Sequence, residues 1–297
     1  MKIYLSILLL TCSFLVVSQI TLIPDVNFEQ ELINQNIDTD GVINGQVLTA
    51  DIENILILNL NYKDIDTLEG IEDFNALEEL NCYGNNLYEL DVSQNVNLEK
   101  LNFTRNHLSN INLTNNTNLK ELFCDEWDGD VFWNSFNEEG LDLSTNILLE
   151  KLYCSSLGLS ELDLTNNVNL KILDCSSNDF IELDLSNNVV LEELYANYEA
   201  FDPFYEGTGI LETLYINNGN NINLTVFTAI NNPNLTCIFV DDVDYSNGNW
   251  SLIDDTSHFV ENQAQCDAIV SVEDNIIEIN FSFYPNLQIV CYILIAN

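Results

Sequence analysis

The side chains best able to do chemistry in this chain are its carboxylates. There are 48 Asp and Glu residues against 7 Lys and Arg, and the formal net charge is −41. Two well-placed carboxylates suffice for glycoside hydrolysis, but adjacent acids such as Asp241 and Asp242 arise by chance in a chain this acidic. The two histidines, His107 and His258, form no His-x-x-x-His zinc pair, and the sequence has neither a Gly-x-Ser-x-Gly nucleophile motif nor a phosphate-binding loop. We therefore expect no enzymatic activity, no catalytic residue and no cofactor.

Cation binding is the second chemistry that carboxylates offer. Oxygen-bearing side chains recur at one position of a sequence repeat: Asp91, Asn112, Asp142, Asp163 and Asp184. Ca²⁺ takes several oxygen ligands, so Asp142, Asp163 and Asp184 are weak calcium candidates. The alternative is a solvated acidic surface on which crowded carboxylates hold protons slightly more tightly than usual. We expect this alternative, and no metal site.

Aromatic side chains offer a surface for recognition. One outward-facing strand position of the repeat carries Asn81, Asn102, Phe123, Tyr153, Asp174, Tyr195 and Tyr215. Exposed rings stack on sugars or pack against protein side chains, so the aromatic members are candidate ligand-binding residues: Phe123, Tyr153, Tyr195 and Tyr215. The alternative is that these rings are present because aromatic residues favour strands.

Two insertions, Asp125–Gly140 and Tyr198–Gly209, interrupt the repeat at the same point of the turn. They follow the strands of Leu122 and Leu194, which are three turns and therefore about 15 Å apart. Loops on a repeat scaffold commonly bind ligands, and the candidate residues are Trp127, Trp133, Phe201, Phe204 and Tyr205. The alternative is that the aromatic residues of the insertions, which also include Phe132 and Phe136, pack on one another or on the edge of the fold.

A repeat positions all of these residues. Six Leu-x-x-Leu units begin at Leu77, Leu98, Leu119, Leu149, Leu170 and Leu191, and four of the five intervals are 21 residues. This period is typical of a leucine-rich repeat solenoid, in which each turn buries its apolar side by stacking on the next. Within one turn, Leu101/Phe103 and Ile111/Leu113 alternate with polar residues, as strands do. We predict a right-handed α/β-type superhelix with one firm strand and one looser strand-like segment per turn, little helix, and a parallel sheet on the concave face.

Asparagine and cysteine recur at positions that we expect to be buried. One asparagine position holds Asn95, Asn116, Asn146, Asn167 and Asn188, and another holds Asn85, Asn106 and Asn178. Their amides can bond backbone groups of neighbouring turns that would cost about 1–3 kcal/mol each if left unpaired. Phe103 shares its inward strand position with Cys82, Cys124, Cys154 and Cys175. We expect buried thiols there; the rival is a disulfide or metal site between neighbours, which parallel side-chain directions would strain.

The alternation of Leu-x-x-Leu-Asp-Cys-Ser-x-Asn with Leu-x-x-Leu-Asp-Leu-Ser-x-Asn, as in 170–188, resembles secreted bacterial leucine-rich repeat proteins of an internalin-like kind. The opening Ile23-Pro-Asp-Val-Asn-Phe-Glu and the closing Asn234-Leu-Thr-Cys237-Ile-Phe-Val-Asp-Asp resemble their caps. The resemblance covers about residues 23–285 and implies a solenoid capped at both ends. It names no ligand, since such repeats bind many things. We expect an N-terminal cap at 19–54, repeats at 55–234, a C-terminal cap at 235–267 and a tail at 268–297.

The segment 1–18 has the pattern of a secretory signal peptide, with Lys2 followed by an apolar run that ends at Ser18. The alternatives are a membrane anchor, for which the run is slightly short, and a lipoprotein modified at Cys12. Disulfides persist in exported proteins. Because Cys237 and Cys266 lie outside the cysteine positions of the repeat, in the closing segment, we predict that they form a disulfide.

The segment 271–286 resembles the linker and first strand of a type IX secretion sorting domain, which opens with Phe-Ser-x-Tyr-Pro-Asn-Pro. Leu287 stands where the last proline is expected, and ten residues follow it. We interpret 268–297 as a linker and a truncated sorting signal; the alternative is a disordered apolar tail with Cys291 unpaired. The expected location is secreted or at the cell surface, or periplasmic if the sorting signal fails.

The net charge of −41 repels nucleic acid phosphates and anionic lipid surfaces. We expect no nucleic acid partner and no stable membrane insertion after signal cleavage. The predicted function is an exported, non-enzymatic binding protein whose leucine-rich repeat surface recognises or adheres to a protein or glycan. The alternatives are a structural surface protein without a discrete ligand and the degenerate product of a truncated gene.

Overall fold

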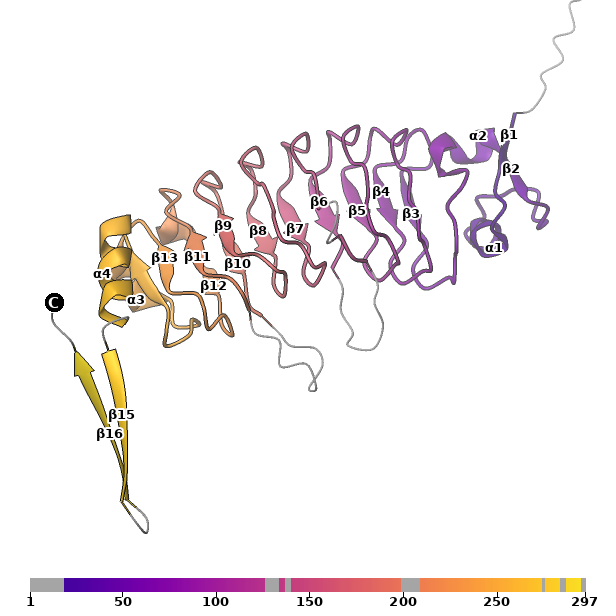
Figure 1. Ribbon diagram of the computed structural model, residues 1–297. Coiled ribbons are helices and arrows are strands. Elements are labelled where there is room, and N and C mark those ends of the chain that lie inside the picture. Colours follow the sequence, from indigo (N-terminus) through magenta and orange to yellow (C-terminus); the bar gives the residue numbers. More distant parts are fainter. Residues whose placement is uncertain are drawn as a thin grey trace, which may run out of the picture.

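The computed structural model describes residues 19–125, 134–136, 140–198, 209–273, 276–283 and 287–294. The chain coils into an elongated leucine-rich repeat solenoid of about nine turns with little helix, as the repeat predicts (Figure 1). The predicted signal peptide, 1–18, lies outside the described residues.

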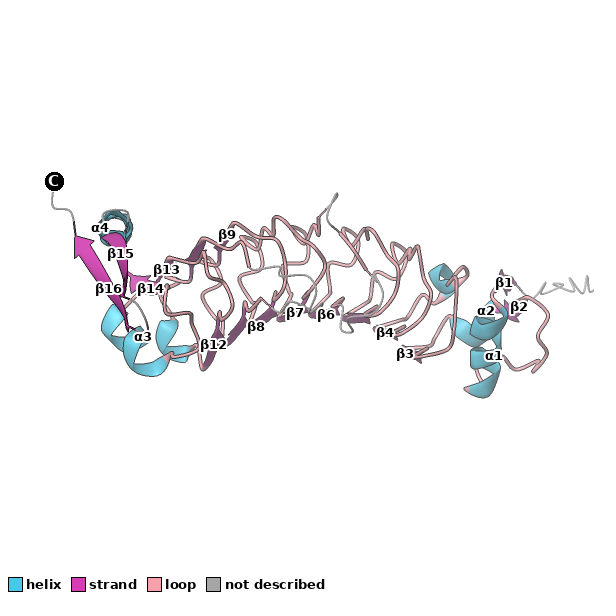
Figure 2. Cartoon of the chain, turned by 60° about the horizontal axis from the view of Figure 1, so that its bottom comes forward, coloured by secondary structure: helices cyan, strands magenta, loops and turns pink. Residues whose placement is uncertain are grey.

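One parallel sheet, the front sheet, runs along the concave edge of the molecule (Figure 2). Its eight strands, in spatial order, are β3 (Ile57–Asn59), β4 (Glu79–Asn81), β5 (Lys100–Asn102), β6 (Glu121–Phe123), β7 (Lys151–Tyr153), β8 (Ile172–Asp174), β10 (Glu193–Tyr195) and β12 (Val226–Thr228). The strands pair so that the central leucines of neighbours, such as Leu101, Leu122 and Leu152, lie opposite one another and are fully buried. Burial of this continuous leucine row stabilises each turn through its neighbours.

A second parallel sheet, the back sheet, forms in the later turns only. It contains β9 (Glu182–Asp184), β11 (Thr213–Tyr215), β13 (Cys237–Phe239) and β14 (His258–Val260). In earlier turns the equivalent segments, such as 111–113 and 141–143, are not paired as strands. The predicted combination of one firm strand and one looser segment per turn is therefore present, and the looser segment becomes a regular strand from residue 182 onward.

The N-terminal cap consists of β1 (Ile20–Leu22), α1 (Val26–Asn34), β2 (Gln46–Leu48) and the short α2 (Thr49–Ile52). Asp25 connects this cap to the first repeat. One carboxylate oxygen accepts hydrogen bonds from the backbone N–H groups of Asn27 and Phe28 at the start of α1, at 2.9 and 3.0 Å. The other accepts from the backbone N–H groups of Asp66 and Thr67, at 2.8 and 3.2 Å. Satisfying helix N-terminal donors in this way stabilises the helix, and the second pair of hydrogen bonds fixes the helix to the solenoid.

Two single 3₁₀ turns, η1 (Ile71–Asp73) and η2 (Asn221–Asn223), occur farther along the chain.

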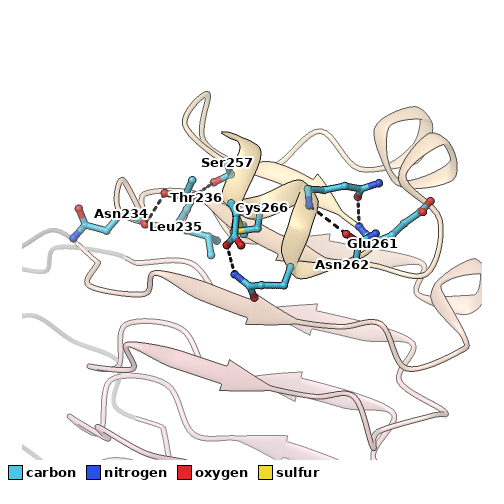
Figure 3. Close-up of a disulfide and its surroundings, with 11 residues drawn as sticks. Asn234, Leu235, Thr236, Ser257, Glu261, Asn262 and Cys266 are labelled. Atoms are coloured by element: carbon cyan, nitrogen blue, oxygen red, sulfur yellow. Dashed lines mark hydrogen bonds between the residues drawn. A yellow bond between two sulfur atoms is a disulfide. The ribbon is translucent and has the colours of Figure 1, made fainter. Parts of the chain in front are cut away.

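The C-terminal cap contains α3 (Val243–Asn249) and α4 (Gln263–Glu273). Parallel strand pairing continues into this region, because β14 pairs with β13. Trp250 packs at the end of the core between Phe227 and Phe259. Its ring centroid is 5.0 Å from that of Phe227 and 5.7 Å from that of Phe259. A disulfide joins Cys237 on β13 to Cys266 on α4 and confirms the predicted pairing (Figure 3).

An antiparallel hairpin follows α4, formed by β15 (Ile276–Phe283) and β16 (Leu287–Leu294). The alternative of a disordered tail is therefore wrong for these residues. The extended backbone agrees with the predicted strand character of the segment before residue 284. Its assignment as a sorting signal remains a prediction.

The asparagine positions form two buried ladders, as predicted. In the front ladder, the Asn106 amide donates to the carbonyls of Cys82 and Phe103 at 3.0 and 2.9 Å, while its oxygen accepts from the Leu87 N–H at 3.1 Å. In the back ladder, each amide spans two carbonyls, as Asn167 does, but the Oδ1 atoms are buried without a hydrogen-bond partner among the described residues: Asn95, Asn116, Asn146, Asn167 and Asn188. In the front ladder both the amide nitrogen and the amide oxygen are hydrogen-bonded, whereas in the back ladder only the nitrogen is, within the ranges that the structure describes.

Asn134 belongs to the front ladder, although the sequence pattern did not single it out. Its amide donates to the carbonyls of Phe103 and Cys124, at 3.1 and 3.4 Å, and its oxygen accepts from the Leu108 N–H at 3.0 Å. The other members follow their inward strand residue by 3 positions, whereas Asn134 follows Cys124 by 10. The first insertion displaces it in sequence while its place in the fold is kept.

The four cysteines of the strand ladder are free, buried thiols, as expected. Burial raises the pKa of the Cys82 thiol to about 12, and it also raises the pKa values of the other three: Cys124, Cys154 and Cys175. A thiol that stays protonated is a poor nucleophile and a poor metal ligand. These cysteines serve as small apolar side chains of the core.

Candidate functional site

Six of the seven residues in the predicted outward column lie on the front sheet. The strand register places Asn81 beside Asn102, Asn102 beside Phe123, and Phe123 beside Tyr153. It continues through Asp174 to Tyr195. All six side chains are half-buried, so the column remains partly open along the concave face.

The placement of Tyr215 in this column was wrong. Tyr215 lies on β11 of the back sheet, where its register neighbours are Asp184 and Phe239, and Thr228 takes the next position of the front column. The sequence of 211–215, Leu-Glu-Thr-Leu-Tyr, is nearly the same as that of the front unit at 191–195, Leu-Glu-Glu-Leu-Tyr. The second insertion lies between the two stretches, so their spacing does not reveal that 211–215 leads into a strand of the back sheet. Tyr215 stacks on Phe239 with ring centroids 4.5 Å apart, beside Cys237 of the cap disulfide. Its ring therefore has a packing role in the C-terminal cap.

Phe123 and Tyr153 form a stacked pair at the centre of the front sheet. Their ring centroids are 4.9 Å apart and their planes differ by 7°. The Lys100 ammonium lies 5.4 Å from the centre of the Phe123 ring, within the range of a cation–π interaction. Tyr195 lies two strands beyond Tyr153, and its hydroxyl donates to Glu193 at 3.1 Å. Three candidate residues of the front column are thus assembled on β6, β7 and β10.

Two carboxylates accompany these rings. Asp174 lies in the column between Tyr153 and Tyr195, and Asp125 follows β6 at the start of the first insertion. Burial, aided by the charge of Asp174, raises the pKa of Asp125 to about 6, and its Oδ1 atom is buried with no hydrogen-bond partner in the part of the chain that the structure describes. Burial also raises the pKa of Asp174, against the lowering effect of the hydrogen bond from the Ser176 N–H at 3.1 Å.

The sequence prediction missed the role of Asp125, because that residue was counted only as the beginning of an insertion. A usable signal was its position two residues after Phe123. Period-two alternation places such a residue on the same side of the strand as the ring.

Lysines on the front sheet are paired with glutamates. Lys100 and Lys151 both reach Glu121, at 3.2 and 2.7 Å. Neighbouring pairs are Lys120–Glu99 at 2.8 Å and Lys171–Glu150 at 2.7 Å. Burial tends to raise the pKa of Glu121, but the bonds from Lys151 and Lys100 hold it below its usual value. No described lysine or arginine is within salt-bridge distance of Asp125 or Asp174, so their charge is uncompensated.

The two insertions leave the solenoid after β6 and β10, which are three strand positions apart in the front sheet, as predicted. Most of their aromatic residues lie outside the described residues, and their binding role remains a prediction: Trp127, Phe132, Trp133, Phe201, Phe204 and Tyr205. Phe136 is described and is fully buried, with its ring centroid 6.4 Å from that of Phe103. For Phe136 the packing alternative is correct.

The calcium candidates Asp142, Asp163 and Asp184 are exposed. Each carboxylate accepts a hydrogen bond from the backbone N–H two residues later, at 2.8 to 2.9 Å. Hydrogen bonds from Ser144 and Thr165 lower the pKa values of Asp142 and Asp163, so the expectation of raised proton affinity was wrong. Across the described ranges, no group of three or more His, Cys, Asp or Glu side chains is arranged to hold a metal ion.

No known sequence family matches the chain, and neither does any curated protein. Solved structures do resemble it. An internalin (InlF) from Listeria monocytogenes aligns over 82% of this chain and 72% of its own, with 22% identity and a TM-score of 0.52. Internalin C2 (InlC2) from the same organism aligns over 82% of this chain and 99% of its own, with 18% identity and a TM-score of 0.54. In the described part of the chain, no helix is long and apolar enough to cross a membrane. The chain has the leucine-rich repeat fold of these internalin structures.

Proposed function

We propose that this protein is an exported, non-enzymatic recognition protein that binds a protein or glycan with the outer surface of its front sheet. The observation that carries the proposal is the stacked Phe123–Tyr153 pair, half-exposed at the centre of the concave face. Rings held in this way present a rigid apolar surface to a ligand at little entropic cost. Tyr195 extends the same surface, and the aromatic residues of the two insertions are further candidate contacts in this proposal.

Export is part of the proposal. It is supported by the signal-peptide pattern of 1–18 and by the disulfide between Cys237 and Cys266, a bond that is rare in reducing compartments. We further propose that 268–297 is a linker and a truncated type IX sorting signal, and that the protein is secreted or reaches the cell surface, or stays in the periplasm if this signal fails. Mass spectrometry of the mature protein tests the first step, with Gln19 expected at the N-terminus.

Binding is tested with the mature protein on glycan and protein arrays. The Phe123→Ala/Tyr153→Ala variant should lose at least about tenfold in affinity for any ligand found, since buried aromatic anchors dominate interfaces. Tyr88→Ala is the matched control, because Tyr88 is exposed and lies in a turn away from this column. Equal affinity of the double variant and the wild type, with both folded, would refute the proposed surface.

A further inference from the structure

Three neighbouring strands of the front sheet carry an aspartate between two tyrosines, a position that we call the slot. Asp174 on β8 is flanked by Tyr153 on β7 and Tyr195 on β10. Adjacent strands are about 4.8 Å apart, so the backbones that carry the two tyrosines are about 10 Å apart. One face of the Tyr153 ring is covered by Phe123, so a ligand would contact its other face. The slot thus combines two aromatic rings with a carboxylate.

The charge of this slot is negative and uncompensated. Asp125 and Asp174 interact electrostatically with one another and with Tyr153. Glu193 adds a further carboxylate beside Tyr195. Lys151, on the same strand as Tyr153, is held 2.7 Å from Glu121 on the preceding strand. Among the described residues, the lysines of the front sheet pair with glutamates, and no lysine or arginine lies within salt-bridge distance of the two aspartates.

We infer that this slot receives a cationic side chain, an arginine or a lysine, of a protein partner. The inference rests on the proposed function and gives the class of ligand. A guanidinium or ammonium group would lie against the ring of Tyr153 and pair with Asp174 and Asp125, combining cation–π and charge-assisted hydrogen bonding. The net charge of −41 attracts a basic partner surface from a distance. A neutral glycan could stack on the rings and donate hydroxyl hydrogen bonds to the carboxylates, but it would bring no positive charge to balance them.

The test uses the mature protein and four blocked pentapeptides, Ac-Ala-Gly-Xaa-Gly-Ala-NH₂, with arginine, lysine, citrulline or norleucine at Xaa. Nuclear magnetic resonance titration gives the affinities. The arginine and lysine peptides should bind about tenfold more tightly than the citrulline and norleucine peptides, which corresponds to one charge-assisted contact. The largest shifts should occur at Tyr153, Asp174 and Tyr195.

Asp125→Asn/Asp174→Asn should abolish the preference for the charged peptides, because asparagine keeps the shape and the acceptor oxygen without the charge. Asp163→Asn/Asp184→Asn removes two carboxylates from exposed positions outside the front sheet and should preserve the preference. Equal binding of all four peptides, no binding of any, or a preference that survives Asp125→Asn/Asp174→Asn would overturn the inference. A different outcome is a glycan or other neutral ligand that binds both the wild type and Asp125→Asn/Asp174→Asn but fails to bind Phe123→Ala/Tyr153→Ala. This result would overturn the inference of a cationic ligand and leave the proposed function in place.

Discussion

The inward leucines, the buried asparagines and the free cysteines have similar surroundings in successive turns, because one turn repeats the environment of the next. Their burial therefore follows from the spacing alone. Asp125 did not follow, because its burial depends on which groups lie on the neighbouring strands. The same dependence makes it the residue whose chemistry differs most from that of an ordinary surface aspartate.

Asp125→Asn should stabilise the protein at neutral pH. The carboxyl has a folded-state pKa of about 6, above the usual value of 3.8, so the folded state binds the proton more tightly. The ionised carboxylate therefore destabilises the fold increasingly as the pH rises from 3.8 to about 6, and fully above about 6. The variant should be more stable by roughly 1–3 kcal/mol at pH 7.5. This advantage should shrink as the pH falls from 6 toward 4. Urea unfolding of both proteins across this range measures it. A constant difference would show that the charge is not responsible.

Asn167→Ala should destabilise the solenoid by about 1–3 kcal/mol, because it leaves the Leu143 and Asn146 carbonyls without their buried donor. Asn166→Ala is the control: Asn166 is exposed and bonds a single carbonyl, that of Ser144. Thermal unfolding of the two variants compares them. Similar melting temperatures would indicate that the ladder contributes through turn preference rather than through its bonds between turns.

Among the elements, the front strands were predictable and the back strands were not. The Leu-x-x-Leu pattern marks the front strands from β4 to β8 and β10, but it also occurs at Leu211–Leu214, which leads into β11 of the back sheet. The misplacement of Tyr215 has the same origin, since its local sequence matches a front strand. Pairing with strands of the neighbouring turns decides which sheet a segment joins, and a local pattern does not contain that information.

The disulfide should stabilise the C-terminal cap more than the rest of the chain. Cys237→Ser/Cys266→Ser removes a bond between residues 29 apart, and the chain-entropy model gives about 3–4 kcal/mol for a loop of this length. Hydrogen exchange should quicken in β13, β14 and α4, while β4 to β6 stay as protected as in the wild type. Because the variant lacks this bond, added reductant should leave its exchange pattern unchanged. Uniform loss of protection along the chain would show that the cap is not a separate cooperative unit.

At the scale of the whole molecule, the fold follows from the period of the sequence and the charge governs how stable that fold is. A net charge of −41 makes the compact state repel itself, and salt screens the repulsion. The ligand surface was only partly predictable from the sequence. Two insertions interrupt the period of the repeat, and Tyr215 was assigned to the front sheet although it lies on the back sheet.

Raising NaCl from about 10 mM to about 300 mM should increase the melting temperature, since the Debye length falls from about 30 Å to below 8 Å. The carboxylates of Asp142, Asp163 and Asp184 already accept backbone hydrogen bonds. CaCl₂ at matched ionic strength should therefore give the same melting temperature as NaCl. A higher value with calcium would revive the cation site on that face.

The unequal lengths of the two sheets have a mechanical consequence. From residue 182 onward, back strands as well as front strands are hydrogen-bonded between turns. Before residue 182, in the described part of the chain, only the front strands pair in this way, and on the back the turns are joined by asparagine side chains such as that of Asn167. The rod should therefore flex mainly in its N-terminal half. The stiffness changes near residue 182, which lies between Asp174 and Tyr195 in the sequence. Bending there would change the distance between Tyr153 and Tyr195, while the C-terminal part of the solenoid keeps its shape.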